Sequence, residues 1–228
     1  KIAVLRLPFG TGNDGSDGRS LDQTLELLTA PSRMELQKAV RVQSASRPDE
    51  TWYAFNIASI GLDAFVTHMT NKVKHLFPGD FYKIWVDLAC LFYSRLFRTG
   101  HMRVTATKLD GTTVFTHEDR MLIYLMGASG FRTYGSNQKI LPDANNVCGV
   151  RDMPLLRKLE LKPHFRNGTH ISFPETVLYT AERLVIEFDE KILVQLDGEA
   201  HMLFREDFPL TMELTEPFIA VLKPAMNA

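Results

Sequence analysis

Five consecutive residues near the start of the chain, Gly10-Thr11-Gly12-Asn13-Asp14, carry side chains well suited to chemistry. They follow an apolar run at residues 2–7, which is typical of a β-strand. Glycines in a turn after a strand let backbone N–H groups approach an anion closely, because glycine has no Cβ. Asn13 and Asp14 add an amide and a carboxylate that suit phosphate oxygens, water or Mg²⁺. The segment therefore predicts a phosphate-binding turn.

A second motif, Asp197-Gly198-Glu199, lies between two runs with β-strand character. A tight turn at this point would present two carboxylates side by side. Asp-Gly is also a common hairpin turn without any chemistry, and for the dipeptide alone that interpretation remains open. Together, the glycine-rich turn and the two acids indicate phosphoryl transfer, which depends on alignment, Mg²⁺ and a base near the acceptor hydroxyl.

The glycines of the first motif also fit the dinucleotide-binding fingerprint, read as Gly10, Gly12 and Gly15. That fold needs a helix that opens at the third glycine and an acid at the end of the next strand. Residues 15–18 delay the helix, and the next strand-like run, residues 35–45, has its only acid at its start. The pattern disfavours a dinucleotide fold. A surface turn without a ligand is the other alternative.

The composition is that of a globular protein with one large or two small domains. The 228 residues are 45% hydrophobic and 23% charged, with a formal net charge of −1, so no overall field favours nucleic acid. The two cysteines, Cys90 and Cys148, are too few for a disulfide framework, and no signal peptide is visible. We expect a cytoplasmic protein. Because a strand begins directly after Lys1, we also expect that an upstream portion is missing.

Periodicity predicts few helices and many strands. Helices are expected at residues 20–30, 63–75, 81–97 and 154–161. The third is apolar almost all round and is expected to be buried, with contact to a lipid surface as the alternative. Strands are expected at residues 36–43, 52–60, 102–109, 112–116, 121–126, 176–188, 192–196, 201–204, 210–214 and 219–222. We expect an α+β, mostly β fold, in which a short α/β N-terminal remnant precedes a large antiparallel β-sandwich with inserted helices.

This layout predicts a shared core between the strands at residues 36–42 and 177–186. Val185 is expected to point into it, so that Val185→Asp would unfold the domain by burying an unpaired charge.

In their order along the chain, four stretches resemble the diacylglycerol kinase catalytic superfamily, specifically bacterial lipid kinases related to sphingosine kinases and NAD kinases. They are residues 7–14, 55–64, 140–144 and 194–199. The resemblance implies two domains. Residues 1–33 would be the C-terminal remnant of an α/β nucleotide-binding domain, and residues 34–228 a β-sandwich lipid-kinase domain whose final strand packs back on the N-terminal part. The family's Gly-Gly-Asp-Gly-Thr motif is absent here, which leaves the activity of this chain alone open.

The resemblance also implies roles for the two motifs. Gly10, Thr11, Gly12, Asn13 and Asp14 would line the phosphates of ATP, and Asp14 and Glu199 would hold Mg²⁺. Asp197 would be the general base, with Glu199 beside it. The implied function is an ATP- and Mg²⁺-dependent lipid kinase that phosphorylates a hydroxyl such as that of diacylglycerol. An NAD kinase and a non-catalytic lipid-binding relative stay open. The implied partners are a lipid and, peripherally, the membrane, but no nucleic acid; a homodimer is left open.

The chain departs from the family at one expected metal site. Where bacterial relatives carry an acidic run that binds a structural Mg²⁺, this chain has Val147-Cys148-Gly149. Neither valine nor a thiol is a good Mg²⁺ ligand, since hard cations prefer oxygen. We expect this site to be missing or rebuilt from Asp143, Asn145, Asn146 or Asp152, and Cys148 to be a small buried residue.

Overall fold

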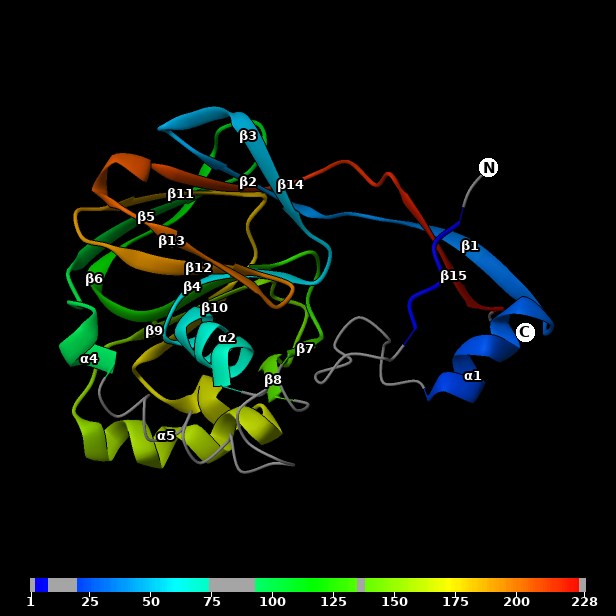
Figure 1. The fold of residues 1–228 in the computed structure, drawn as a ribbon, viewed down its shortest axis with the longest axis horizontal. Coiled ribbons are helices and arrows are strands. Elements are labelled where there is room, and N and C mark those ends of the chain that lie inside the picture. Colours follow the sequence, from blue (N-terminus) through cyan, green and yellow to red (C-terminus); the bar gives the residue numbers. More distant parts are fainter. Residues whose placement is uncertain (1–2, 8–19, 74–92, 135–137, 226–228) are drawn as a thin grey trace.

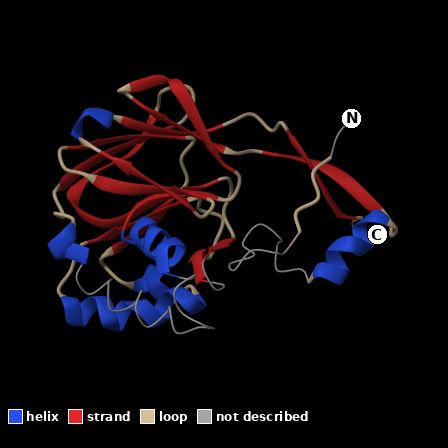
Figure 2. Cartoon of the chain, viewed as in Figure 1, coloured by secondary structure: helices blue, strands red, loops and turns tan. Residues whose placement is uncertain are grey.

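A curled antiparallel sheet forms the main body of the molecule, and helices cover one of its layers (Figures 1 and 2). The computed structural model describes residues 3–7, 20–73, 93–134 and 138–225. Eleven strands make up the sheet. They are β2 (Val40–Ser44), β3 (Arg47–Ala54), β4 (Ile57–Gly61), β5 (His101–Thr107), β6 (Thr113–Gly127), β9 (Val147–Arg151), β10 (Thr176–Tyr179), β11 (Arg183–Phe188), β12 (Ile192–Leu196), β13 (Glu199–Leu203) and β14 (Leu210–Leu214). The expected fold class, α+β and mostly β, is confirmed.

The long strand β6 belongs to both layers of the body. The strand order is β13-β12-β4-β6-β5-β11-β14-β2-β3, with β9 also paired to β6 and β10 to β9. Residues 113–120 of β6 pair with β5, whereas residues 121–127 pair with β4 and β9. The sheet therefore folds over along β6, and its inner faces bury a common apolar core, which includes Val42, Leu184, Ile186 and Met212 from one layer and Ala58, Ile60 and Val194 from the other.

A second apolar core lies between the β4–β12 layer and the helices. Because side chains alternate along a strand, Ile57 and Leu193 point to this second core while their neighbours Ala58 and Val194 point to the first. Phe65, Tyr93 and Leu161 fill it from the helical side. The helices are α2 (Leu62–Val73), α4 (Tyr93–Leu96) and α5 (Leu155–Asn167), with short 3₁₀ turns at Thr169–Ser172 and Arg205–Asp207.

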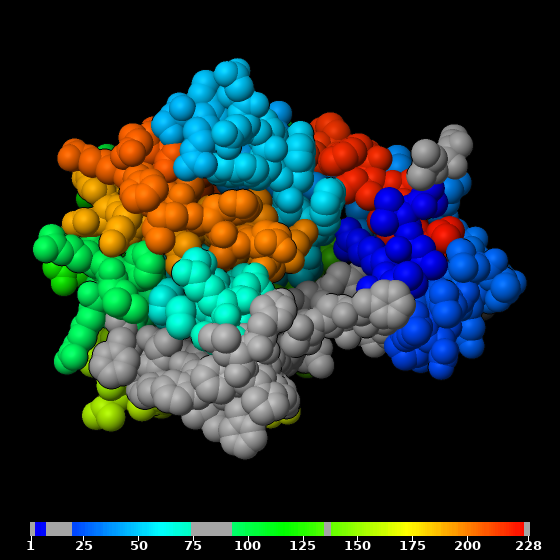
Figure 3. Space-filling view, viewed as in Figure 1, coloured from blue at the N-terminus to red at the C-terminus, as the bar shows by residue number. Residues whose placement is uncertain are grey.

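An arm beside the body is built from segments near both ends of the chain (Figures 1 and 3). It contains α1 (Leu21–Leu25), the 3₁₀ turn Glu26–Leu28, β1 (Ser32–Gln37) and β15 (Ile219–Pro224). Ser20 caps α1 in a capping box with Gln23. β15 pairs antiparallel with β1, and Val4 bridges β15 at Val221. The final strand thus lies against the N-terminal part of the chain, and the domain boundary expected after residue 33 falls inside β1.

Several expected elements differ from those observed because tertiary pairing overrides the local pattern. The strand expected at residues 36–43 is split between β1 and β2, and the strand expected at residues 176–188 is split between β10 and β11. The strands expected at residues 112–116 and 121–126 are a single strand, β6. The loop after β6 contains β7 (Arg132–Tyr134) and β8 (Gln138–Leu141), and α5 continues through Pro163 to Asn167. Most of the helix expected at residues 81–97 lies outside the described residues; α4 falls in the part that is described.

The expectation for Val185 is wrong. Val185 is half-buried and does not belong to the core, whereas its neighbours Leu184 and Ile186 are fully buried in it. The register of β11 between β5 and β14 puts the odd-numbered residues on the outer face. Leu184→Asp, rather than Val185→Asp, is the substitution that buries a charge here.

A buried carboxylate joins the turn between β2 and β3 to the segment before β14. Asp207 accepts hydrogen bonds from the hydroxyls of Ser44 and Ser46, from the Arg47 guanidinium at 3.0 and 3.1 Å and from the Phe204 N–H. Burial by itself would raise the pKa of Asp207. The hydrogen bonds outweigh burial and lower its pKa from 3.8 to about 2.

Because this pKa is lowered by folding, Asp207 stabilises the protein above about pH 4 and loses that effect as the pH falls through about 2. We expect Asp207→Asn to reduce the free energy of unfolding by about 1–2 kcal/mol at about pH 6, after allowance for solvent screening. The deficit should shrink as the pH approaches about 2. Urea unfolding at both pH values measures it. The control is Asp49→Asn, an exposed carboxylate on β3; an unchanged Asp207→Asn deficit at low pH would contradict the assignment.

Candidate functional site

Asp197 lies at the tip of the hairpin that connects β12 and β13. Its φ is +50° and that of Gly198 is +102°. Two consecutive residues with positive φ are the signature of a type I′ turn, whose twist matches that of the flanking strands. The Asp197 N–H donates to the Ile57 carbonyl at 3.2 Å, so the tip of the hairpin is attached to β4.

The carboxylate of Asp197 is held by the turn between β3 and β4. Oδ1 accepts hydrogen bonds from the N–H groups of Asn56 at 2.9 Å and Ile57 at 3.0 Å, and Oδ2 accepts a short one from the Phe55 N–H. An ionised carboxylate has about four acceptor positions. Residues in the described part of the chain use three of them, and the fourth is on Oδ2. The side chain is therefore fixed in place, and these contacts leave one position for a hydroxyl donor.

The sequence did not predict this turn. Residues 52–60 were expected to form one strand, but Phe55 and Asn56 separate β3 from β4. Asn56, a common turn residue within an otherwise apolar run, is the signal that could have indicated the break. The partner that stabilises the turn, Asp197, is more than 140 residues further along the chain.

Glu199, the second acid of the motif, is the first residue of β13 and is opposite Leu196 in the register of the hairpin. The side chains of Asp197 and Glu199 are both solvent-exposed. The structure thus places two exposed carboxylates two residues apart on one hairpin; their joint role in a site remains a prediction. Hard oxygen donors of this kind fit Mg²⁺, which often takes one or two carboxylates together with substrate phosphates.

Two guanidinium groups from other segments reach the same turn. Arg132, on β7, donates to the Asn56 side-chain oxygen at 3.4 Å and to the Ser129 hydroxyl at 2.9 Å. Arg6 donates to the Phe55 carbonyl at 3.5 Å. These positive charges lie next to the segment that holds Asp197, and positive charge there suits a phosphate group. Sequence reasoning missed both residues, since neither belongs to a recognisable motif.

Gly10, Thr11, Gly12, Asn13 and Asp14 lie outside the described residues. The described segment just before them, residues 3–7, contains Arg6 and runs along β15. The contact between Arg6 and Phe55 brings this segment to the β3–β4 turn. The role of the glycine-rich motif remains a prediction.

The residues expected to rebuild a structural metal site have other partners. Asp143 binds the backbone N–H of Asn145 at 2.8 Å, and the buried Asn146 amide bonds to the backbone of neighbouring segments. Asp152 forms an ion pair with Lys158 at 2.6 Å. Among the described residues, no three His, Cys, Asp or Glu side chains lie close enough to hold a metal ion.

Cys148 lies on β9 and is fully buried. Burial raises the pKa of its thiol well above the ordinary value. A buried, protonated thiol is unreactive, which agrees with the expectation of a small packing residue.

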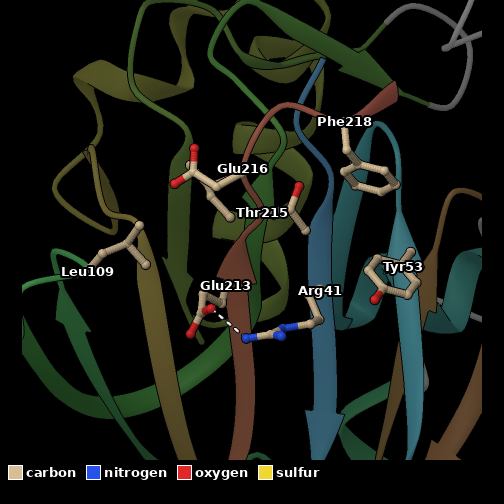
Figure 4. A pocket seen from close by; sticks show the side chains of 8 residues that line it. Arg41, Tyr53, Leu109, Glu213, Thr215, Glu216 and Phe218 are labelled. Carbon is tan, nitrogen blue, oxygen red and sulfur yellow. Dashed lines mark hydrogen bonds and ion pairs between the residues drawn. The ribbon is translucent and has the colours of Figure 1, made fainter. Parts of the chain in front are cut away.

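A separate hollow of about 410 Å³ lies where β2 and β14 leave the body toward the arm (Figure 4). An ion pair between Arg41 and Glu213 at 2.6 Å crosses its wall, and Tyr53 meets Phe218 edge to face. Glu216 adds a further negative charge. The hollow contains none of the Asp197 site residues, and its excess of carboxylates disfavours a phosphate ligand.

The fold is of the diacylglycerol-kinase type. Two solved structures of a candidate diacylglycerol kinase from Bacillus anthracis str. Sterne match with a TM-score of 0.59 and 16% identity, over 96% and 94% of this chain and 68% and 67% of theirs. A diacylglycerol kinase structure from the same organism matches with a TM-score of 0.52 and 12% identity, over 93% of this chain and 63% of its own. This chain therefore spans about two thirds of each of them. No protein-family model and no curated protein matches the sequence.

None of the helices in the described part of the chain has the length and apolar character needed to span a bilayer.

Proposed function

We propose that this protein is an ATP- and Mg²⁺-dependent lipid kinase that transfers the γ-phosphoryl group of ATP to a lipid hydroxyl such as that of diacylglycerol. The observation that carries the proposal is the presentation of Asp197: three backbone N–H groups fix its carboxylate at an exposed hairpin tip, and no other described residue takes the remaining acceptor position on Oδ2. The diacylglycerol-kinase-like fold supports the choice of reaction.

In the proposed reaction, the lipid hydroxyl donates a hydrogen bond to Oδ2 of Asp197. Its oxygen forms a bond to the γ-phosphorus while the bond from that phosphorus to the β–γ bridging oxygen breaks, so that ADP leaves. The hydroxyl proton passes to Asp197. Proton transfer is needed only as the new bond forms, so a rigid carboxylate close to the hydroxyl is an adequate base.

The phosphates of ATP would lie against residues 10–14. Arg6 and Arg132 supply positive charge beside the β3–β4 turn, which suits the phosphates. Asp14 and Glu199 would hold Mg²⁺. When bound, the metal neutralises charge on the transferred phosphoryl group. The chain's own contribution is to keep Asp197 and Glu199 on one short turn, so that the base and the metal side of the site have a fixed spacing.

A lipid hydroxyl is reached from the surface of a membrane. We therefore place the protein in the cytoplasm with a peripheral membrane contact, and leave a homodimer open. The segment first considered for a lipid contact, residues 81–97, is described only at α4 and the residue after it.

Transfer of labelled γ-phosphate tests the proposal. The full-length product of the reading frame and this chain are each incubated with ATP, Mg²⁺ and a panel of lipids in mixed micelles, with NAD as a separate acceptor. Label on a lipid from the full-length product, lost in Asp197→Asn, supports the kinase. Label on NAD instead would establish an NAD kinase.

A non-catalytic relative is the second candidate, and one observation favours it. Most acceptor positions of Asp197 are used for backbone hydrogen bonds, which is also what a purely structural turn residue would do. Binding of lipid vesicles without label on any acceptor would support this alternative.

A further inference from the structure

Three polar side chains interrupt the apolar surface where α2 packs on the sheet. Ser59 of β4 and Gln195 of β12 are cross-strand partners, and both are fully or nearly fully buried. They lie on the face that carries Ile57 and Leu193, which belongs to the second core. Asp63, in the first turn of α2, is 3% exposed. Buried polar groups on such a surface need hydrogen-bond partners.

Their side chains are connected by a series of hydrogen bonds that ends at the tip of the β12–β13 hairpin. The Ser59 hydroxyl donates to Oδ2 of Asp63 and accepts from the Gln195 amide nitrogen at 2.8 Å. The Gln195 oxygen accepts from the Gly198 N–H at 3.0 Å. The opposite side of the same residue, the Gly198 carbonyl, accepts from the Asn71 amide at 2.9 Å. Two points of α2 therefore hold the turn that carries Asp197.

We propose that Asp63 is a positioning residue, which fixes the Asp197-Gly198-Glu199 turn through Ser59 and Gln195. The inference rests on the proposed function only for its effect on catalysis. The physical coupling between Asp63 and the turn can be measured without any activity.

The direction of the hydrogen bonds depends on the charge of Asp63. An ionised Asp63 accepts from the Ser59 hydroxyl, which leaves the Ser59 oxygen to accept from Gln195. The amide of Gln195 is then oriented with its oxygen toward the Gly198 N–H. A protonated Asp63 becomes a donor to the Ser59 oxygen. The Ser59 hydroxyl must then donate to another acceptor, and the sequence of hydrogen bonds from Asp63 to Gly198 is disrupted.

This change falls in an accessible pH range. Burial raises the pKa of Asp63 from 3.8 to about 6, although hydrogen bonds from Ser59 and the Ala64 backbone oppose the rise. Titratable groups that face Asp63 in the described part of the chain are Tyr93 on α4 and Cys148 on β9. Burial raises the pKa of both, so they stay neutral while Asp63 titrates.

NMR of the uniformly ¹⁵N-labelled protein tests the coupling through the amide of Gly198. In the wild type, its chemical shift should titrate with a midpoint of about 6, together with the ¹³Cγ signal of Asp63. In Asp63→Asn the amide should not titrate in this range. Since burial of the ionised carboxylate costs stability above about pH 4, this variant is expected to fold.

Ser59→Ala is the matched control, because it keeps Asp63 but removes the hydroxyl that links Asp63 to Gln195. The Asp63 carboxyl should still titrate in this variant, while Gly198 no longer follows it. Asp119→Asn, on β6, should leave both titrations unchanged. The proposal would be overturned if the chemical shift of the Gly198 amide stayed constant in the wild type while Asp63 titrates. It would also be overturned if that shift changed with pH equally in Ser59→Ala.

Kinase assays give the second readout. At about pH 7, Asp63→Leu, which removes the acceptor of the Ser59 hydroxyl, should lower kcat about tenfold or more with little change in the KM for lipid, as expected when a catalytic group is misplaced rather than removed. Unchanged kcat in a folded variant would overturn the positioning role. A wild-type protein without kinase activity would refute the proposed function, yet the Gly198 titration would still decide whether Asp63 controls the turn.

Discussion

Gly61→Ala is expected to destabilise the protein by about 2–6 kcal/mol. Gly61 has a φ of +107°, and a Cβ on it would lie 2.2 Å from the Leu122 carbonyl oxygen of β6. Backbone strain at such a φ costs about 1–3 kcal/mol, and overpacking of a rigid neighbour costs about 1–3 kcal/mol more. Gly61 is also the point where β4 passes into α2, so relief of the clash would displace Asp63.

Urea unfolding of the purified variant measures this loss. Gly111→Ala is the matched control, because Gly111 also has a positive φ, +86°, but no atom lies within 4 Å of its added Cβ. It should lose only the backbone part, about 1–2 kcal/mol. Equal losses in the two variants would show that the contact with β6 relaxes at no cost.

Asp197→Asn should reduce phosphate transfer by about 10²- to 10⁴-fold, the usual contribution of a general base. Asparagine tolerates positive φ, so the turn itself should persist. Its oxygen can still accept from Asn56 and Ile57, but its NH₂ group would face the Phe55 N–H. Loss of that one acceptor should also cost about 1–3 kcal/mol of stability.

Activity and stability must therefore be measured together, by the labelled-phosphate assay and by urea unfolding on the same samples. Asp110→Asn is the control, since Asp110-Gly111 is the same dipeptide in the hairpin between β5 and β6. It should change neither quantity appreciably. Activity of a folded Asp197→Asn within about tenfold of the wild type would reduce Asp197 to a structural role.

The parts of the fold that depend on local signals were predictable. The helix expected at residues 63–75 is observed as Leu62–Val73, and the strands at 192–196 and 210–214 have the expected bounds. Asp197-Gly198 is a hairpin turn, as its dipeptide indicates. In each case the periodicity and the turn residues agree with the tertiary environment.

The features that the sequence left unresolved depend on distant pairing. The sequence of β6 predicts two strands because its burial pattern changes at Met121 from alternating to continuous. At this residue the strand passes from the edge of one layer to the middle of the other. Phe55-Asn56 reads as part of a strand because the carboxylate that satisfies its N–H groups is remote in sequence. Arg6 and Arg132 had no local signal at all.

The arm is joined to the body by two strands rather than one. At the joint, Ala39 and Thr215 exchange hydrogen bonds at 2.9 and 3.0 Å, and the Phe218 N–H donates to the Gln37 carbonyl at 3.2 Å. A single linker would leave the arm free to rotate about one chain, whereas two hydrogen-bonded strands restrict that rotation. We therefore expect displacement of the arm relative to the body to require bending of both strands together, at a joint that lies beside the hollow lined by Arg41, Tyr53 and Glu213.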